Sequence, residues 1–367
     1  MTATFYTRLR GRSARAPVSM SDRVAIVVIG RNEGPRLVSC LESLAGVDAR
    51  AVYVDSNSSD GSPRLAREAG LEVLELDGSQ PLSAARARNE GFYRLAGVAP
   101  NVRYVQFIDG DCTLVPGWLE RAAEALDARA DVVAVCGTVR ERNRQCNIYS
   151  RLADLEWQKE PGEVRACGGN FMVRADAFSA SGGFRPEVVA GEEGEFCLRL
   201  RQRGGRILQL DGDMVWHDVA MTHFSQWWRR ARRTGYAFGQ GAALHGHQPE
   251  RHNVRERRRL IAWGIALPLS MIAASWPTRG GSFALSLLYA VLALRIFRYG
   301  RWRGWSGPDA ALYAVFTVLD KFPGALGLLE YSWRRVRRKG PRLIEHKNQP
   351  GSVPLGARPG FPTESGG

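Results

Sequence analysis

Two carboxylates stand one residue apart at Asp109-Gly110-Asp111, directly after an apolar run. Acids with this spacing can face one ligand in a tight turn, and Gly110 removes the steric obstacle between them. Hard carboxylate oxygens suit Mg2+ or Mn2+, and such an ion neutralises charge that builds on a departing diphosphate. His217 is a candidate additional ligand, followed by His223. Asp and Gly also end strands for purely structural reasons, so the tripeptide alone leaves both explanations open.

A second acidic cluster, Gly191-Glu192-Glu193-Gly194-Glu195, precedes a segment of helical spacing at residues 196–203. Acids at the beginning of a helix are favoured by the helix dipole, which is the structural explanation. Alternatively, one of them is a general base, because a neutral hydroxyl is a poor nucleophile. Upstream, Gly168-Gly169-Asn170 precedes an apolar strand; its glycines either admit a ligand close to the backbone or simply make a turn.

Short apolar runs alternate with helical spacing through the first two thirds of the chain, which predicts βαβ units and a mostly parallel sheet. Polar residues follow the runs: Asn32-Glu33 the first, Asp55 the second, and Asp109 to Asp111 the fourth. Ligands bind beyond the carboxyl ends of strands in such sheets, so one crevice is expected to collect these side chains. The predicted strands are residues 24–29, 51–54, 71–76, 104–108 and 131–139, with helices at 36–44, up to 69, and 82–95.

The net charge of +14 is concentrated around three apolar runs near the C-terminus. Between His223 and Glu345 there are 21 Lys/Arg and 6 Asp/Glu, and this excess of basic residues accounts for the whole net charge. Residues 260–277 carry no charge, which is close to the shortest length that spans a bilayer, and 282–294 form a second apolar run. Basic residues that bracket apolar runs favour a membrane surface over DNA.

The first two runs are expected to form a hairpin with both ends in the cytoplasm, because arginines flank the pair while the link carries only Arg279. The third run, 310–331, contains Asp320 and Lys321 and is expected at the membrane interface or packed within protein. These features predict attachment to the cell inner membrane, with the α/β domain in the cytoplasm. The alternative is a soluble helical domain with unusually apolar helices.

Composition divides the chain into five predicted parts. The first 21 residues hold four arginines and no apolar run, so they are not expected to be a secretory signal. Six scattered cysteines without a CxxC pair are expected to be reduced, consistent with the cytoplasm.

The five predicted parts of the chain are a disordered basic N-terminus (1–21), an α/β domain (22–245), a basic linker (246–259), membrane-associated helices (260–338) and a disordered tail (339–367).

Several motifs, taken in order, resemble the family 2 class of inverting glycosyltransferases over roughly residues 24–241. The resemblance implies a GT-A fold, a Rossmann-like, mostly parallel sheet, together with a nucleotide-diphosphate sugar donor, Mg2+ or Mn2+, and inversion at the anomeric carbon. The matching segments are the opening strand and Asn-Glu turn (24–33), the aspartate-rich turn (54–61), the Ala-Arg-Asn-x-Gly helix (85–91), the Asp-x-Asp motif (107–111) and the acceptor-side Gly-Gly-Asn (168–170).

Roles carry over from the family to the matching positions, with Asp55 at the nucleobase and Asp111 favoured as the direct metal ligand. Glu193 stands where the family has an aspartate base; it is one methylene longer, so the base sits differently or Glu192 serves instead. The assigned residues are Asn32, Glu33, Asp55, Arg88 and Asp109 for the nucleotide sugar, Gly169 and Asn170 for the acceptor, and Asp109, Asp111 and His217 for the metal.

The segment Gln226-Trp-Trp-Arg229-Arg230 is similar to the Gln-x-x-Arg-Trp motif of processive polysaccharide synthases. Arg230 stands in place of the motif's tryptophan, and this difference argues against processive polymerisation. Arg229 and Arg233 would face phosphates or anionic lipid. Apolar helices beside the crevice favour a lipid-linked acceptor, or a glycan, in cell-envelope or polysaccharide biosynthesis.

Three alternatives stay open at this point. A nucleotidyltransferase would need a glycine- and lysine-rich phosphate loop, whereas residues 30–34 are short and acidic. The second alternative is a basic protein that binds nucleic acid or a membrane. Nucleic acid is not an expected partner, because the basic residues bracket apolar runs. The third is a degenerate family member that acts as a scaffold.

Overall fold

Four parallel strands form the first half of the sheet in the computed structural model, which describes residues 20–338. They lie in the order β3-β2-β1-β4, and every residue of the central strand β1 is buried, as expected for an apolar run between layers of helices. The predicted strands of this half are confirmed. Their bounds are β1 Val24–Gly30, β2 Arg50–Asp55, β3 Glu72–Glu75 and β4 Tyr104–Asp109.

The second half of the sheet is mixed, because antiparallel strands surround the one parallel pair, β6 and β9. β8 lies antiparallel between β4 and β6, while β5 and β7 pair antiparallel with β9. Of these strands β6 and β8, the apolar strand after Asn170, were predicted. The expected parallel arrangement describes the first half and not the whole sheet. The bounds are β5 Cys112–Leu114, β6 Val132–Glu141, β7 Gly162–Glu163, β8 Phe171–Arg174 and β9 Arg206–His217.

Helices pack around this sheet, and one of them approaches it unusually closely. A Cβ atom at Gly91 of α3 would overlap Val27 of β1, so the helix lies directly on the central strand. The three predicted helices of the first half are confirmed as α1 to α3, and all six cysteines are free thiols. The helices are α1 Pro35–Leu44, α2 Ser62–Glu68, α3 Ala84–Val98, α4 Trp118–Ala128, α5 Ile148–Trp157, α6 Ala175–Ser181 and α7 Glu192–Gln202.

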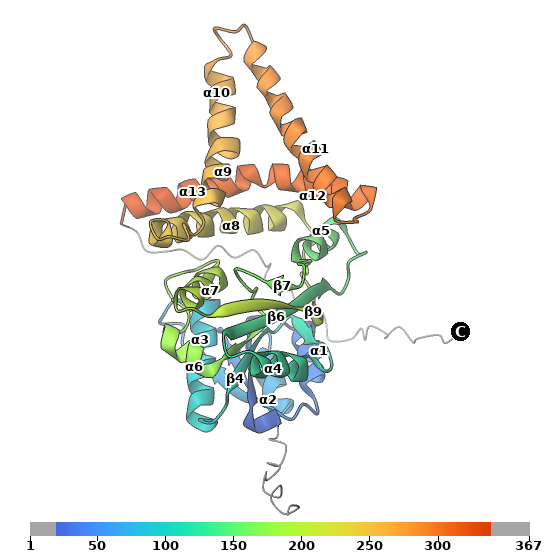
Figure 1. Cartoon of the computed structure of the whole chain (residues 1–367), viewed down its shortest axis with the longest axis vertical. Helices are drawn as coiled ribbons and strands as arrows, with labels where there is room; N and C mark the ends of the chain where they lie inside the picture. The colour runs from blue at the N-terminus through green and yellow to red at the C-terminus, as the bar shows by residue number, and fades with distance from the viewer. Residues whose placement is uncertain (1–19, 339–367) are drawn as a thin grey trace, which may run out of the picture.

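A helical appendage stands on the α/β domain (Figure 1). Its base is α8 (Phe224–His245) with α13 (Lys321–Val336) lying along it. Glycines make the crossing tight: a Cβ at Gly235 of α8 would overlap the carbonyl of Gly324, and one at Gly327 of α13 would overlap the carbonyl of Arg232. Backbone therefore touches backbone where these two helices cross.

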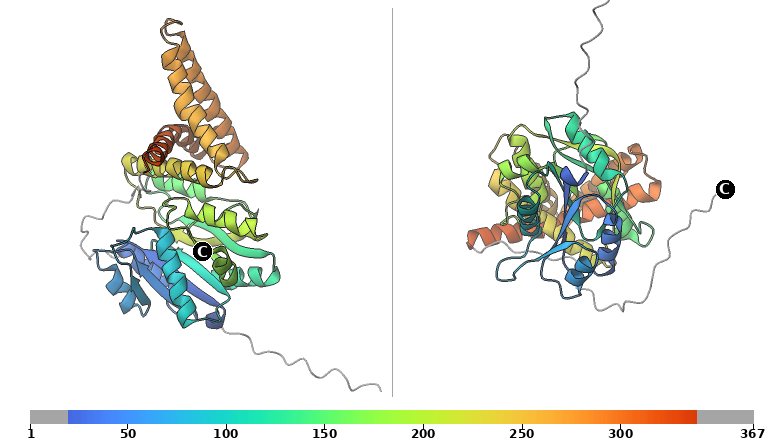
Figure 2. Two further views of the ribbon diagram at one scale, coloured as in Figure 1. Left: turned by 90° about the vertical axis from the view of Figure 1, so that its left-hand side faces the viewer. Right: turned by 90° about the horizontal axis from the view of Figure 1, so that it is seen from below.

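Two helical arms project from this base as a hairpin, away from the sheet (Figures 1 and 2). The first arm runs without a break through α9 (Val254–Leu260), the π-helix η2 (Ile261–Ala266) and α10 (Leu267–Ala273). The second arm contains the 3-10 helix η3 (Gly281–Ser286) and α11 (Leu287–Trp302). Part of the predicted linker 246–259 is thus helical, because α9 begins at Val254.

Two helical stretches of the described chain are long and apolar enough to cross a membrane. In the second arm, Gly281–Trp302, only 6% of the most apolar 18-residue window is buried within the protein. The other stretch, Gly307–Val336, comprises α12 (Gly307–Leu319) and α13 and lies across the foot of the hairpin (Figure 1). In its most apolar 18-residue window the buried share is 39%. The third predicted run therefore packs against protein, as expected from its charged residues. Of the predicted disordered ends, 1–19 and 339–367 lie outside the described residues.

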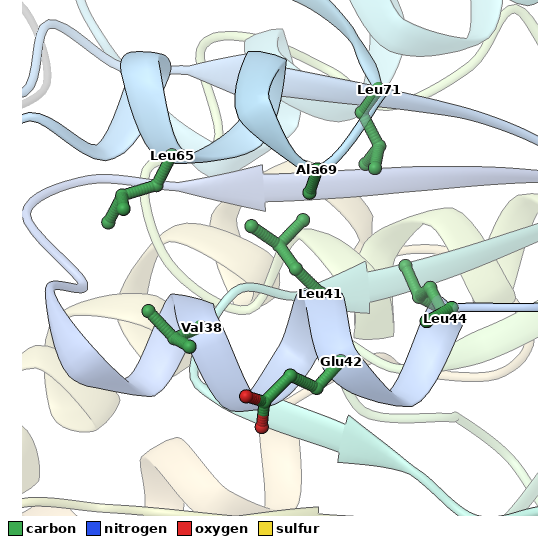
Figure 3. Close-up of a pocket in the computed structure, with 8 residues that line it drawn as sticks. Val38, Leu41, Glu42, Leu44, Leu65, Ala69 and Leu71 are labelled. Atoms are coloured by element: carbon green, nitrogen blue, oxygen red, sulfur yellow. The ribbon is translucent and has the colours of Figure 1, made fainter. Parts of the chain in front are cut away.

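A shallow apolar pocket opens between α1 and α2 (Figure 3). Glu42 is the only charged residue among its lining, and none of the predicted site residues lines it. The pocket is therefore treated as a packing gap between two helices. Its lining residues are Val38, Leu41, Glu42, Leu44, Ala45, Leu65, Ala69 and Leu71.

Replacement of Gly235 by alanine is expected to destabilise the protein, because the added methyl group forces α8 and α13 apart. Overpacking of this kind costs about 1–3 kcal/mol, and thermal unfolding in detergent measures it. The matched control is Gly97→Ala in α3, where an added Cβ meets nothing within 4 Å. Equal unfolding temperatures for the two variants would contradict the tight crossing.

Candidate functional site

A buried arginine, Arg88 of α3, connects the end of β4 to the beginning of α7. Its Nη2 donates a hydrogen bond to Asp109 Oδ1 at 2.9 Å, and its Nη1 lies 3.1 Å from Glu192 Oε1 and 3.3 Å from Glu193 Oε1. The side chain is 2% exposed, with the guanidinium 5.4 Å from the centre of the Phe184 ring. Residues from three separate motifs therefore meet at one point. One positive charge faces three carboxylates there.

The pKa of Glu193 is raised to about 7 in this environment. Burial is the largest cause, the negative charge of Glu192 adds to it, and the positive charge of Arg88 opposes it. A carboxylate with this pKa is a stronger base than an ordinary glutamate and is still partly ionised near neutral pH. Burial and crowding by a like charge thus give Glu193 the acid–base properties that suit a proton acceptor.

The Gly-Gly-Asn segment holds Asp109 in place. Asn170 Oδ1 accepts a hydrogen bond from the backbone N–H of Asp109 at 2.9 Å, and its Nδ2 lies 3.3 Å from Cys112 Sγ. A Cβ at Gly169 would overlap the Asp109 carboxylate and lie 2.5 Å from Arg88 Nη2, so only glycine fits. The structure thus brings Gly169 and Asn170 to the acid cluster. Their predicted contact with an acceptor stays a prediction.

The turns after β1 and β2 are tied together by side chains. Asp55, 1% exposed, accepts hydrogen bonds from Tyr53 Oη at 3.0 Å and from Ser58 N at 2.7 Å. Asn32 Oδ1 accepts from Ser59 N at 2.8 Å, and Asn32 N donates to Ser58 Oγ at 2.9 Å. The two predicted nucleotide-side residues therefore shape adjacent loops.

Glu33 follows Asn32 in the first turn and is 6% exposed. Its carboxylate pairs with Arg36 of α1 at 2.9 Å. Beside it, Gly110 needs to be small, because a Cβ there would lie 3.2 Å from the Ile29 carbonyl and 3.3 Å from Glu33 Cγ. The first turn is thus packed against the Asp-Gly-Asp turn.

Asp111 and His217 face each other across a pair of antiparallel strands. Cys112 of β5 is paired with His217 of β9, and this register places His217 Nε2 3.4 Å from Asp111 Oδ2. Ligand atoms of Asp111, Cys112 and His217 all lie within 4.8 Å of one another. Asp109 is outside this set and pairs with Arg88 instead.

The donor set of Asp111 and His217 fits a divalent metal. The carboxylate oxygen of Asp111 suits both Mg2+ and Mn2+, whereas the imidazole nitrogen of His217 suits a transition-metal ion such as Mn2+ better than Mg2+. Burial, followed by the charge of Asp111, raises the pKa of the Cys112 thiol well above its usual value. Mg2+ and Mn2+ are hard ions that prefer oxygen to sulfur ligands, so Cys112 is the least suitable ligand of the three. His223 is instead the N-cap residue of α8, and its Nδ1 lies 2.7 Å from Thr222 Oγ1.

The Gln226 to Arg230 motif serves the helical base. Gln226 Oε1 accepts hydrogen bonds from the backbone of Thr222 and His223 at 2.8 and 2.9 Å, which completes the N-terminus of α8. Arg230 pairs with Glu156 of α5 at 2.7 Å. Both residues therefore have structural partners in this chain.

Three residues at the site were not predicted from the sequence: Glu141, Trp157 and Phe184. Glu141 ends β6 and lies 3.5 Å from His217 Nδ1, while the Trp157 ring lies 4.5 Å from the His217 ring, edge to face. An acid at the carboxyl end of a strand was an available signal for Glu141. Nothing in the local sequence marks Trp157 or Phe184, because both meet their partners through long-range packing.

Replacement of Glu193 by glutamine is expected to change the pH dependence of stability. Because the folded-state pKa of Glu193 lies above its ordinary value of 4.5, the folded protein holds this proton between pH 4.5 and about 7 while the unfolded chain has lost it. The native protein therefore loses stability as pH rises through that window. Thermal unfolding should show Glu193→Gln more stable than the native protein at pH 8 and similar at pH 4. A variant equally or less stable at pH 8 would contradict the raised pKa.

Comparison with known proteins agrees with this geometry. The glycosyl transferase family 2 model matches residues 25–181. Over 296 residues the chain is 29% identical to the pre-mycofactocin glycosyltransferase of Mycobacterium tuberculosis, which covers 77% of this chain and 58% of that protein. The chain thus spans less than two thirds of that relative. It is also 25% identical over 335 residues to the succinoglycan biosynthesis protein ExoA of Rhizobium meliloti, covering 85% of this chain and 94% of that one.

The fold is similar to a mannosyltransferase from Pyrobaculum calidifontis, solved in complex with GDP-Man and Mn2+. The two structures superpose with a TM-score of 0.56 at 20% identity, covering 85% of this chain and 88% of that one. Residues 25–181 therefore match the glycosyl transferase family 2 model, in a chain with the GT-A fold.

Proposed function

We propose that this chain is a metal-dependent, inverting glycosyltransferase, which moves a sugar from a nucleotide-diphosphate sugar to an acceptor hydroxyl. The observation that carries the proposal is the meeting of Glu193, Asp109 and Arg88. Asp111, in the turn before β5, and His217, at the end of β9, face each other nearby. Such a set combines a proton acceptor with positions for a metal-bound diphosphate. The names of the relatives, which include glycosyltransferases, support the reaction class.

Glu193 is the proposed base. Its carboxylate takes the proton of the acceptor hydroxyl as the oxygen forms a bond to the anomeric carbon. The bond from that carbon to the diphosphate breaks on the opposite face, and its electron pair leaves with the diphosphate. A single displacement of this kind inverts the stereochemistry. Glu192, 3.1 Å from the same arginine, is the alternative base.

Donor binding is assigned to the turns after β1, β2 and β4. Asn32, Glu33 and Asp55 form the wall expected to hold the nucleotide, and Asp109 would contact the sugar-diphosphate. Arg88 is buried beneath Asp109, so it orients the acids from below. A Mg2+ or Mn2+ ion at Asp111 and His217 would supply positive charge to the departing diphosphate. Gly169 and Asn170 lie on the proposed acceptor side.

The helical hairpin supports attachment to a membrane. Leu269, Ile272 and Leu287 on its arms are more than half exposed. A contiguous apolar surface of this kind is energetically unfavourable in water. Exposed arginines surround the foot, among them 257–259, Arg295 and Arg298. We propose that the hairpin enters the inner membrane from the cytoplasmic side and that the acceptor is lipid-linked. The name of the succinoglycan biosynthesis relative supports a role in envelope or polysaccharide synthesis.

Release of nucleotide diphosphate tests the proposed reaction. Detergent-purified protein is given Mn2+, a panel of nucleotide sugars and a membrane lipid extract. Glu193→Gln is expected to slow release about 10²–10⁴-fold, since it removes the base, and Asp111→Asn is expected to slow it strongly, since it removes a metal ligand. Absence of release with every donor would indicate a scaffold rather than an enzyme.

The chain supplies its own control for the metal ligand, a second Asp-Gly-Asp at Asp211-Gly212-Asp213 within β9. Asp211 is exposed and away from the acids around Arg88, so Asp211→Asn should release nucleotide diphosphate at the native rate. Equal rates for Asp111→Asn and Asp211→Asn would contradict the metal assignment.

A further inference from the structure

A buried carboxylate, Glu141, lies behind His217 on the side away from Asp111. It is 2% exposed, and its Oε2 lies 3.5 Å from His217 Nδ1, while His217 Nε2 faces Asp111 at 3.4 Å. Backbone N–H groups fix both of its oxygens: Val219 N donates to Oε2 at 3.1 Å and Asn143 N to Oε1 at 3.3 Å. The carboxylate is thus held rigidly against one nitrogen of the imidazole.

A negative charge beside Nδ1 influences which nitrogen of the imidazole carries the proton and which can bind a ligand. It favours a proton on Nδ1, which leaves the lone pair on Nε2, the nitrogen that faces Asp111. Carboxylates behind metal-binding histidines fix the ring orientation and raise the basicity of the ligating nitrogen in this way. The Trp157 ring, 4.5 Å away and edge to face, limits rotation of the imidazole from another side.

A backbone hydrogen bond followed by ion pairs connects Glu141 to the foot of the helical hairpin. The backbone N–H of Glu141 donates to Asp154 Oδ1 of α5 at 3.2 Å. Arg144 then bridges two acids, with its Nε 2.9 Å from Asp154 Oδ2 and its Nη2 3.0 Å from Asp309 Oδ2 in the first turn of α12. Arg151 of α5 also pairs with Asp309. The helix that carries Trp157 and supports Glu141 is therefore fastened to the appendage.

We propose that Glu141 is a positioning residue that orients His217 for a divalent metal, and that the Asp154–Arg144–Asp309 ion pairs hold Glu141 in place from the foot of the hairpin. The inference rests on the proposed metal site and adds two parts to it. It assigns a role to a buried acid that is not among the residues proposed to bind donor or acceptor. It also makes metal affinity depend on the helical appendage, which shares no residue with the metal site.

Binding of Mn2+ alone tests this inference, measured from the loss of the free-ion electron paramagnetic resonance signal on titration of the full-length protein in detergent. Glu141→Gln keeps the size of the side chain and removes its charge, and it should weaken Mn2+ binding about 10-fold or more. Glu141→Asp keeps the charge and should bind more tightly than Glu141→Gln. Asp309→Asn should weaken binding by a smaller factor than Glu141→Gln does.

Two further variants separate the possible outcomes. Glu163→Gln, at an exposed ion pair with Arg206, is the matched control and should bind Mn2+ as the native protein does. Loss of affinity in His217→Ala with native affinity in Glu141→Gln would overturn the positioning role and leave the metal site standing. Native affinity in His217→Ala would overturn the metal site itself. Native affinity in Asp309→Asn would overturn the connection to the hairpin.

Discussion

The guanidinium of Arg88 is the charge around which the site is organised. A buried charge is costly unless it is paired, and Arg88 pairs with acids from two distant segments, the end of β4 and the beginning of α7. Both segments need to be in place for the arginine to be buried. Because three carboxylates face one cation, excess negative charge remains. Burial raises the pKa of Glu193, and the excess negative charge adds to this shift. The same charge would favour a divalent cation at the adjoining position.

Strand pairing in the sheet places the other site residues next to this cluster of charges. Antiparallel pairing of β5 with β9 brings His217 to Asp111, two residues far apart in the chain. Close approach of backbone at Gly91 and Gly169 lets α3 and the Gly-Gly-Asn segment come near enough to hold Arg88 and Asp109. The second half of the sheet thus does more than complete the core, since it supplies the histidine and the acid behind it.

Local patterns in the sequence predicted the parallel strands, because each is an apolar run that ends in polar residues. They could not predict β5 or β7, which are three and two residues long and exist only through pairing with β9. The tripeptide Asp-Gly-Asp occurs twice, and only the first copy ends a parallel strand beside other acids. Glu141 escaped prediction because its role depends on a histidine from another strand. Burial and strand register distinguish such site residues from residues with a similar local sequence, and both are known only once the fold is known.

The central claim is that Glu193 acts as a base whose pKa is held down by Arg88 against burial and the charge of Glu192. The pH dependence of nucleotide diphosphate release in the native protein and in Arg88→Gln tests it most directly. We expect the native rate to rise with pH through about 7, the pKa of Glu193. In the variant, loss of the positive charge should move that rise to higher pH. A rise at the same pH in both proteins would contradict the claim.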